Sequence, residues 1–363
     1  MTETADEIRK KIEEIDEEIL ELIQKRGEAA ASMGKLKASK MLPLVVPEVE
    51  KVVIGRYTAK AAATGMSEKS LTDIARLLIK ESIEIQARIP RPAAAKRILI
   101  IGGAGQMGRW LCDYFSSRGH EVSVFDRKMS EKDHNNTDLS EASNKADVIV
   151  ISTPIETTAG IANEIISSKT KALIFDIASI KTPFLESFQD FAKHGVNICS
   201  THPMFGSKAN GIIGRNVIVC DCGNASAALE AEKLFEGANI IRMDVTEHDK
   251  LMAYVLGLSH ALNIVFNSAL MKSGIPFDVL SSVSSTTFQK QSELSIDVAF
   301  DNADLYYTIQ TANPYNRDSI SHLKEAMYEL REFDREEFLM LMAESRNYFN
   351  LCGWKSKQPD LQA

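Results

Sequence analysis

The chain has 363 residues, of which 44% are hydrophobic, and its formal net charge is −8. A chain of this length is expected to form two or three domains, each able to bury its own core. The negative charge argues against nucleic acid as a partner, so an anionic substrate requires a local cluster of Arg and Lys. No run of about 18 apolar residues is present and the N-terminus lacks a secretory signal, so we expect a cytoplasmic protein without membrane spans. The five cysteines complete no zinc motif, and we expect no metal site.

Residues 4–40 are predicted to form one long helix. Apolar positions step by four, three, four and three residues, and glutamates fill the opposite face (Ile8, Ile12, Ile15, Ile19, Leu22). Pro43 and Pro47 end this helix, a second is expected over 48–63, and Ser67 can cap a third that runs to about residue 88. Because three such helices cannot enclose a core, we expect an intertwined homodimer.

Basic residues on the first predicted helix carry more information than its apolar ones. At a rise of about 1.5 Å per residue, Arg9 lies too far from Arg26 and Lys37 to meet them within one subunit. In an antiparallel dimer, Arg9 of one chain could reach Arg26 and Lys37 of the other. Each of the three could also be an ordinary solvated surface charge.

Residues 5–88 resemble the all-helical chorismate mutase family. The resemblance rests on E-I-R-K-K-I-x-x-I-D-x-x-I-L-x-L-I-x-K-R, then G-K-L-K, P-x-V-V-P-E and K-E-S-I-E-I-Q. It implies rearrangement of chorismate to prephenate, which needs a positioned dianion and stabilisation of the charge that grows on the ether oxygen. It also implies these roles: Arg9 from the partner subunit and Arg26 bind the carboxylates, Lys37 and Gln86 face the ether oxygen, Glu50 meets the hydroxyl, and Ser82 lines the pocket.

One position departs from the mutase pattern. Where the family usually has P-E-R-E, this chain has Pro47-Glu48-Val49-Glu50, so Val49 replaces an active-site arginine. Either the mutase activity is weakened or another residue supplies the positive charge of that arginine.

The stretch 97–108 reads as a strand, a tight turn and a helix. Gly103, Gly105 and Gly108 fit G-x-G-x-x-G, with Gln106 and Met107 between the last two glycines. In this pattern the glycines allow the turn, the approach of a pyrophosphate and close packing of helix on strand. The pyrophosphate then binds at the helix N-terminus, so we predict a dinucleotide site.

A second strand after the glycine turn ends in an acidic residue. Asp126 follows Glu121–Phe125 at the distance expected for an acid that binds a ribose 2′-hydroxyl, which favours NAD because a carboxylate would repel a 2′-phosphate. Arg127 and Lys128 directly follow Asp126, and their positive charges leave NADP as an alternative cofactor.

From residue 96 to about 245, apolar strands alternate with amphipathic segments, as expected for a doubly wound, mostly parallel sheet. Ligands of such sheets bind beyond the carboxyl ends of the strands. Polar residues at these ends are Ser152-Thr153-Pro154, the run Asp176–Lys181 and the run Ser200–Gly206. Ser179, Lys181 and His202 are therefore candidates for a hydride-transfer site, although Ser, Thr and Pro are also ordinary loop residues.

Four separated motifs over about residues 96–325 resemble prephenate dehydrogenase: I-I-G-G-A-G-Q-M-G-R, D-I-A-S-I-K, T-H-P-M-F-G and E-H-D-K-L-M-A. The resemblance implies that His202 takes the proton of the 4-hydroxyl of prephenate as hydride leaves the same carbon. It further implies that Ser179 orients His202, that Lys181 contributes to the anion site, and that loss of CO2 yields 4-hydroxyphenylpyruvate.

Beyond residue 246 the chain is predicted to be helical over 247–273, 277–297, 303–311, 317–331 and 335–349. The resemblance implies that these helices form a dimerisation domain and that His260 takes part in feedback by tyrosine; a helix-packing histidine is the alternative. Asp297 stands where the family commonly has an arginine for the ring carboxylate. Lys290 and Arg317 are candidates to replace it, as is a residue of the second subunit.

We therefore expect a multidomain chain: an all-α three-helix chorismate mutase domain (1–90), a linker (91–96), an α/β doubly wound Rossmann domain that binds NAD (97–245), an all-α dimerisation and substrate domain (246–354) and a tail (355–363). The two resemblances together imply a bifunctional enzyme of tyrosine biosynthesis. Three alternatives stay open: an arogenate dehydrogenase, a dehydrogenase whose mutase-like domain is only a scaffold or amino-acid sensor, and a dinucleotide-sensing protein that catalyses nothing.

Overall fold

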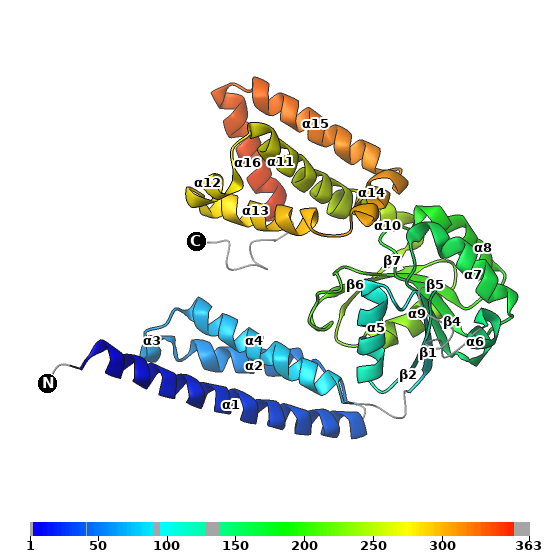
Figure 1. The fold of residues 1–363 in the computed structure, drawn as a ribbon, viewed down its shortest axis with the longest axis horizontal. Helices are drawn as coiled ribbons and strands as arrows, with labels where there is room; N and C mark the ends of the chain where they lie inside the picture. The colour runs from blue at the N-terminus through cyan, green and yellow to red at the C-terminus, as the bar shows by residue number, and fades with distance from the viewer. Residues whose placement is uncertain (1–2, 41, 90–94, 128–137, 352–363) are drawn as a thin grey trace. The chain divides into compact units, whose positions relative to one another are not determined.

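The computed structural model describes residues 3–40, 42–89, 95–127 and 138–351 (Figure 1). Contacts between residues divide the chain into two compact units. The first comprises Met1–Ala178 and Ser187–Met243, and the second comprises Ser179–Glu186 and Asp244–Ala363. Lys128 and Cys352 lie outside the described residues, as does most of the predicted linker.

The N-terminal part of the first unit is helical. Thr4 and Glu7 form a capping box that starts the first helix, and Pro47 occupies the first turn of the second. The predicted helix over 48–63 is divided near Lys60, and Gly65, in the left-handed conformation with φ +70°, ends the short helix that follows. The helices are α1 (Ala5–Ser39), α2 (Pro47–Thr58), α3 (Ala61–Thr64) and α4 (Glu68–Ala87).

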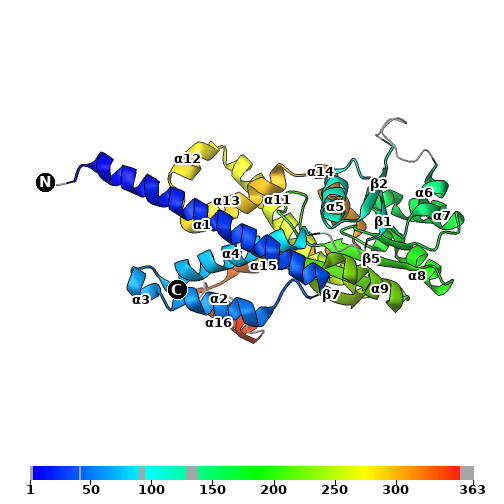
Figure 2. The ribbon, with the colours of Figure 1, turned by 90° about the horizontal axis from the view of Figure 1, so that it is seen from below.

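Only the C-terminal half of α1 is packed within the chain. Gly34 lies so close to α4 that an added Cβ would come 2.9 Å from Cα of Gln86. The N-terminal half extends beyond α4 (Figure 2) and its apolar stripe is exposed, with Ile12 at 53% and Ile15 at 55%. The predicted apolar stripe is therefore real, but this chain alone does not cover it.

A seven-stranded sheet follows, in the order β2-β1-β3-β4-β5-β6-β7. Strands β2, β1, β3, β4 and β5 are parallel, and β6 is antiparallel to β5. The strands are β1 (Arg97–Ile101), β2 (Glu121–Phe125), β3 (Val148–Ile151), β4 (Leu173–Asp176), β5 (Ile198–Pro203), β6 (Asn216–Asp221) and β7 (Asn239–Asp244). Helices beside the sheet are α5 (Gln106–Ser117), α6 (Leu139–Lys145), α7 (Thr158–Ser167), α8 (Leu185–Lys193) and α9 (Ala225–Glu232).

This topology confirms the predicted doubly wound sheet. β1, β3 and β4 are buried along nearly their whole length, as parallel strands covered on both faces must be. The chain reverses its direction of winding at β1, whose neighbours are β2 and β3, so a crevice is expected beyond the carboxyl ends of β1 and β3.

The second unit is formed mainly by helices. The expected helix over 277–297 is divided because Ser285 caps a new helix, its side chain accepting the N–H of Phe288. The expected helix over 247–273 contains a π-helical stretch, Ala253–Leu258. The α-helices are α10 (Val245–Met252), α11 (Ser259–Ser273), α12 (Phe277–Ser282), α13 (Thr286–Ala299), α14 (Ala303–Ala312), α15 (Asn316–Glu332) and α16 (Arg335–Leu351).

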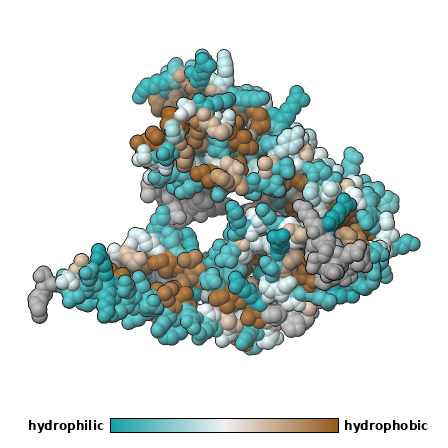
Figure 3. All heavy atoms as spheres, viewed as in Figure 1, coloured by the Kyte–Doolittle hydropathy of each residue, from teal (hydrophilic) through white to brown (hydrophobic). Residues whose placement is uncertain are grey.

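Within the described residues, one helical stretch is long and apolar enough to cross a membrane by length and composition, namely Val245–Ser273. Polar and charged residues interrupt this stretch, so it contains no unbroken run of 18 apolar residues. His248 and Asp249 are buried within it, whereas several of its apolar residues, among them Leu251 and Val255, are exposed. Apolar side chains also gather on the surface of these C-terminal helices (Figure 3), including Leu262 at 46% exposure.

Candidate active sites

The glycine turn has no room for side chains. An added Cβ on Gly102, which has φ +85°, would come 2.3 Å from the carbonyl oxygen of Ser152. On Gly103 it would meet Val124 at 2.5 Å, and on Gly108 it would meet the carbonyl oxygen of Gly102 at 2.2 Å. Each glycine thus lets a specific neighbouring group come close to its backbone. Among the three, only Gly102 has a positive φ, and the sequence analysis did not single it out.

Asp126 holds the glycine turn in place. Its carboxylate oxygen accepts the backbone N–H of Ala104 at 2.9 Å, which joins the end of β2 to the turn after β1. Gly105 is the N-cap of α5, so Gln106 and Met107 form its first turn and present unpaired N–H groups there. Arg127 is exposed directly after Asp126. This arrangement fits a dinucleotide, because the N–H groups of the first turn of α5 can donate to the pyrophosphate and the Asp126 carboxylate can accept from the ribose.

The loop after β3 lies against the glycine turn. Ser152 donates its N–H to the carbonyl oxygen of Ile101 at 2.8 Å, and the Thr153 methyl group would lie 3.0 Å from a Cβ on Gly102. Pro154 then caps a short 3-10 helix, Ile155–Thr157. The predicted cofactor residues of the two loops are therefore neighbours.

His202 lies near the carboxyl end of β5 and is only 4% exposed. β5 pairs with β4 in a register that places Ser200 opposite Asp176. Asp176 is fully buried; its carboxylate accepts the N–H of Ala178 at 2.7 Å, and its carbonyl oxygen accepts the Thr201 hydroxyl at 2.8 Å. These bonds fix the start of the loop that continues to Ser179 and Lys181.

The loop after His202 packs against the helix that starts at the glycine turn. Trp110 of α5 donates its indole N–H to the carbonyl oxygen of Ala209 at 2.8 Å, and its ring meets Phe205 edge-on. The Ser207 hydroxyl lies 3.4 Å from the side-chain oxygen of Gln106. Two predicted site loops, separated by about a hundred residues, are thus brought together.

In the second unit, Asp249 anchors the loop that carries Lys181. Its carboxylate accepts the N–H of Lys181 at 3.0 Å and both the N–H and the hydroxyl of Thr182, at 2.7 and 2.6 Å. His248 Nδ1 lies 2.7 Å from the same carboxylate. Although burial acts to raise the pKa of Asp249, the hydrogen bonds from His248 and Thr182 lower it below its ordinary value. Sequence reasoning missed Asp249, although it lies within the quoted motif E-H-D-K-L-M-A.

Lys181 itself is fully buried, and its amine lies 5.8 Å from the centre of the Phe184 ring. Ser179 is half-buried. The two candidate replacements for the missing arginine are exposed, unlike Lys181: they are Lys290 of α13 and Arg317 of α15.

His260 packs against an aromatic ring, with 4.4 Å between its centre and that of Tyr306. Burial lowers the pKa of His260, and its buried Nδ1 has no hydrogen-bond partner among the described residues. The pKa of Tyr306 is raised by burial and by the carboxylates of Asp301 and Asp297. Asp297, at the position of the missing arginine, therefore acts electrostatically on Tyr306.

The predicted mutase residues cluster along α1, α2 and α4. Arg26 donates to the carbonyl oxygen of Leu78 at 2.5 Å and to the Ser82 hydroxyl. Lys37 donates to the carbonyl oxygen of Leu44 at 2.5 Å. Gln86 is buried and its side-chain oxygen, an acceptor, has no partner among the described residues.

Two further mutase candidates lie nearer the surface. Glu50 is half-buried on α2. Arg9 is exposed and paired with Asp6 at 2.9 Å. Since α1 is continuous, Arg9 and Arg26 lie about 26 Å apart along the same helix. Arg9 could therefore join Arg26 only from a second chain.

A cavity of about 430 Å³ opens beside Arg26. Its remaining lining residues come from α2, the turn after it and α4: Val53, Arg56, Tyr57, Lys60 and Leu71. Sequence reasoning missed Arg56 and Lys60. The signal was available, because Val49, Val53, Arg56 and Lys60 step by four, three and four residues and so share one helix face.

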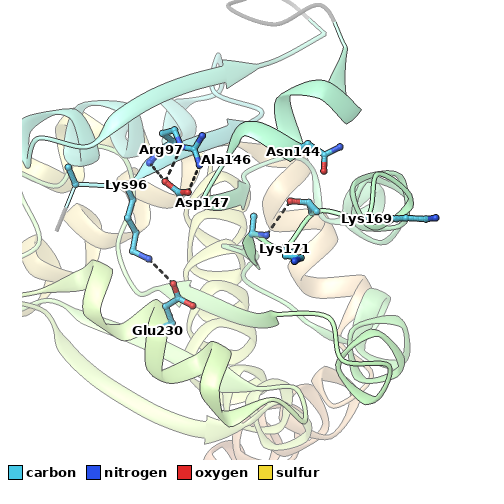
Figure 4. A pocket seen from close by; sticks show the side chains of 11 residues that line it. Lys96, Arg97, Asn144, Ala146, Asp147, Lys169, Lys171 and Glu230 are labelled. Carbon is cyan, nitrogen blue, oxygen red and sulfur yellow. Dashed lines mark hydrogen bonds and ion pairs between the residues drawn. The ribbon is translucent and has the colours of Figure 1, made fainter. Parts of the chain in front are cut away.

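A second cavity, of about 690 Å³, lies at the opposite edge of the sheet, at the amino ends of β1, β3 and β4 (Figure 4). Two ion pairs cross it, Lys96 with Glu230 at 2.7 Å and Arg97 with Asp147 at 2.6 Å. Lys169 and Lys171 extend its basic rim. Ligands of doubly wound sheets bind at the carboxyl ends instead, and none of the predicted site residues lines this cavity.

Comparison with known proteins matches both parts of the chain. The family described as chorismate mutase type II matches residues 8–87, and the nucleotide-binding domain of prephenate dehydrogenase matches residues 115–248. The chain belongs to the family of fused chorismate mutases and prephenate dehydrogenases. Both parts of this bifunctional family are present in the expected order.

Relatives of the bifunctional family extend over nearly the whole chain. The T-protein of Enterobacter agglomerans is 26% identical over 345 residues, which is 92% of this chain and 89% of that protein. The chorismate mutase of Methanocaldococcus jannaschii is 34% identical over 86 residues, covering 24% of this chain and 87% of that protein.

The prephenate dehydrogenase of A. aeolicus, solved with hydroxyphenyl propionate and NAD+, superposes with a TM-score of 0.56 at 17% identity, covering 74% of this chain and 99% of that one. At this identity the likeness establishes the fold.

Proposed function

We propose that the chain catalyses two successive steps of tyrosine biosynthesis, rearranging chorismate to prephenate and then oxidatively decarboxylating prephenate to 4-hydroxyphenylpyruvate. The observation that carries the second step is the packing of the His202 loop on α5, the helix that begins at the glycine turn, through Trp110 and Ala209. The observation that carries the first is the contact of Arg26 with Ser82 beside a cationic cavity.

The cofactor of the dehydrogenase is NAD. When bound, it accepts the hydride that leaves the substrate ring. Gly103 and Gly108 allow the close packing that shapes the turn, the first turn of α5 donates to the pyrophosphate, and Asp126 accepts from the ribose. A 2′-phosphate would meet the Asp126 carboxylate, which disfavours NADP.

In the dehydrogenase, His202 accepts the proton of the 4-hydroxyl group, so that the carbonyl of the product forms as hydride departs. Ser179 orients His202, and Lys181 contributes positive charge near the bound anion. The burial of His202 excludes water from this proton transfer. Lys290 or Arg317 binds the ring carboxylate in place of the family's arginine, until that group leaves as CO2.

The mutase requires no proton transfer from the protein. Arg26 and the partner subunit's Arg9 hold the two carboxylates in the reactive conformer, and Glu50 binds the hydroxyl group. Lys37 and Gln86 donate to the ether oxygen, where negative charge develops as the C–O bond breaks.

A homodimer completes the mutase site. The exposed apolar stripe of α1 is the surface that a second chain would cover, and its antiparallel pairing brings Arg9 to Arg26 of the partner. The C-terminal helices provide a second apolar surface for the same purpose (Figure 3). We also propose a cytoplasmic location, and tyrosine as a feedback ligand near His260.

An assay that follows NADH formation tests this function. We expect NADH from both prephenate and chorismate with NAD, and His202→Asn should reduce the rate from prephenate by about 100-fold or more while chorismate is still consumed. NADH from prephenate alone would mean that the N-terminal domain is a scaffold or sensor. No NADH from either substrate would contradict the proposal.

A specific observation favours a second candidate, an arogenate dehydrogenase. Asp297 stands in place of the expected arginine and acts on Tyr306, and arogenate, unlike prephenate, carries an ammonium group to which a carboxylate can bind. Comparison of kcat/KM for prephenate and arogenate decides between the two.

A further inference from the structure

We infer that Arg56 supplies the carboxylate-binding charge that this chain lost when valine came to occupy position 49, and that Lys60 assists it. The inference rests on the proposed mutase function and identifies a substrate-binding residue that the family pattern does not contain. It is carried by the cavity of about 430 Å³ that Arg26, Arg56 and Lys60 line together.

The charge in this cavity is uncompensated. Three of its six lining residues are cations, Arg26, Arg56 and Lys60, and none is acidic. Neither Arg56 nor Lys60 forms an ion pair or a side-chain hydrogen bond with another described residue. Cations that face one cavity repel one another, so the arrangement favours an anionic ligand. The volume is within the range of small-molecule sites.

Position on the helix allows Arg56 to take over the role of residue 49. Seven residues separate Val49 from Arg56, nearly two full turns, so they share one face of α2 at a separation of about 10 Å along the axis. A long helical side chain covers the turn on the N-terminal side of its own Cα, which directs Arg56 back towards Val53 and Val49. Val53 lies between them and lines the same cavity.

The chemistry of the guanidinium suits the role. Its planar N–H donors match both oxygens of a carboxylate, and Arg26, already held by Leu78 and Ser82, provides the second cation that a dianion requires. Because a carboxylate is present in chorismate and in the transition state alike, Arg56 is expected to contribute to KM more than to kcat.

Substitution of Arg56 in the full-length chain tests the inference. We expect Arg56→Gln to reduce kcat/KM for chorismate by about 10- to 100-fold, mainly through KM, because it removes a charge-assisted hydrogen bond. Lys60→Gln should have a smaller effect in the same direction. Lys51→Gln, which removes a cation from another face of α2, is the matched control and should leave chorismate turnover unchanged.

A rescue variant separates loss of binding from loss of folding. Restoring the family's arginine in Val49→Arg/Arg56→Gln should recover most of the lost kcat/KM, and NADH formation from prephenate should be the same in all variants. Full activity of Arg56→Gln, or failure of the rescue in a protein that still oxidises prephenate, would overturn the inference but leave the proposed mutase intact. Absence of chorismate turnover by the unmodified protein would overturn both.

Discussion

Asp249 and Lys181, 68 residues apart in the sequence, are joined by a hydrogen bond of 3.0 Å from the Lys181 N–H to the Asp249 carboxylate. Thr182 and His248 donate to the same carboxylate, which is nearly fully buried. One side chain therefore fixes the backbone of the loop that carries the predicted anion-binding residue.

Removal of this carboxylate is expected to impair the dehydrogenase selectively. Asp249→Ala leaves several buried donors without an acceptor, and each such unsatisfied donor typically costs about 1–3 kcal/mol. NADH formation from prephenate should fall at least about tenfold, whereas chorismate turnover should persist. Asp318→Ala, which removes an exposed carboxylate from α15, is the control. Equal loss in both variants would contradict this role of Asp249.

Acid should destabilise the protein partly through Asp249. Because its pKa is lowered in the folded state, the unfolded chain binds more protons at low pH. The stabilisation from the carboxylate is complete above its ordinary pKa of about 4 and is lost as pH falls through the lower folded value. Urea unfolding at pH 5 and pH 3 measures this. The loss of unfolding free energy between the two should be smaller in Asp249→Asn, and an unchanged loss would contradict the prediction.

Gly108→Ala is expected to abolish use of the cofactor. The added Cβ would lie 2.2 Å from the carbonyl oxygen of Gly102 and displace the turn that receives the pyrophosphate. We expect the KM for NAD to rise at least about tenfold with chorismate turnover unaffected. Gly160→Ala on α7 is the matched control, since no atom lies within 4 Å of its added Cβ. An unchanged KM for NAD in Gly108→Ala would refute the assignment.

Lys290 and Arg317 are the two candidates for binding the ring carboxylate. Replacement of the functional one by alanine should raise the KM for prephenate by about tenfold or more, because a charge-assisted hydrogen bond is lost. Steady-state kinetics of the two single variants identifies it. Retention of full dehydrogenase activity by both Lys290→Ala and Arg317→Ala would rule out both.

Dimerisation is expected to be necessary for the mutase. Ile15→Glu places a charge in the exposed stripe of α1 and should weaken the dimer and abolish chorismate turnover by separating the paired mutase domains, whereas Glu17→Gln should not. Light scattering after size exclusion measures the mass.

Mixing two inactive variants, Arg9→Ala and Arg26→Ala, should then restore about a quarter of the activity, since half of the dimers regain one intact site. A monomeric protein with full mutase activity would contradict the shared site.

Local pattern in the sequence determined the secondary structure closely. The spacing of Ile8, Ile12 and Ile15 predicted α1, which the structure confirms, and the predicted strand Glu121–Phe125 is β2. Glycine spacing located the dinucleotide turn as well. Periodicity and turn chemistry are properties of neighbouring residues, so they can be read before the chain folds.

Tertiary structure alone decided which distant residues share a site. Arg56 faces the same cavity as Arg26, and Asp249 anchors the loop of Lys181, although nothing in the local sequence of either partner names the other. The sequence showed that Val49 stands where the family has a positive charge. Which residue could supply that charge instead depended on how α2 packs against α1 and α4. Such pairings follow from the packing of whole helices, which buried surface over many residues determines and no short motif records.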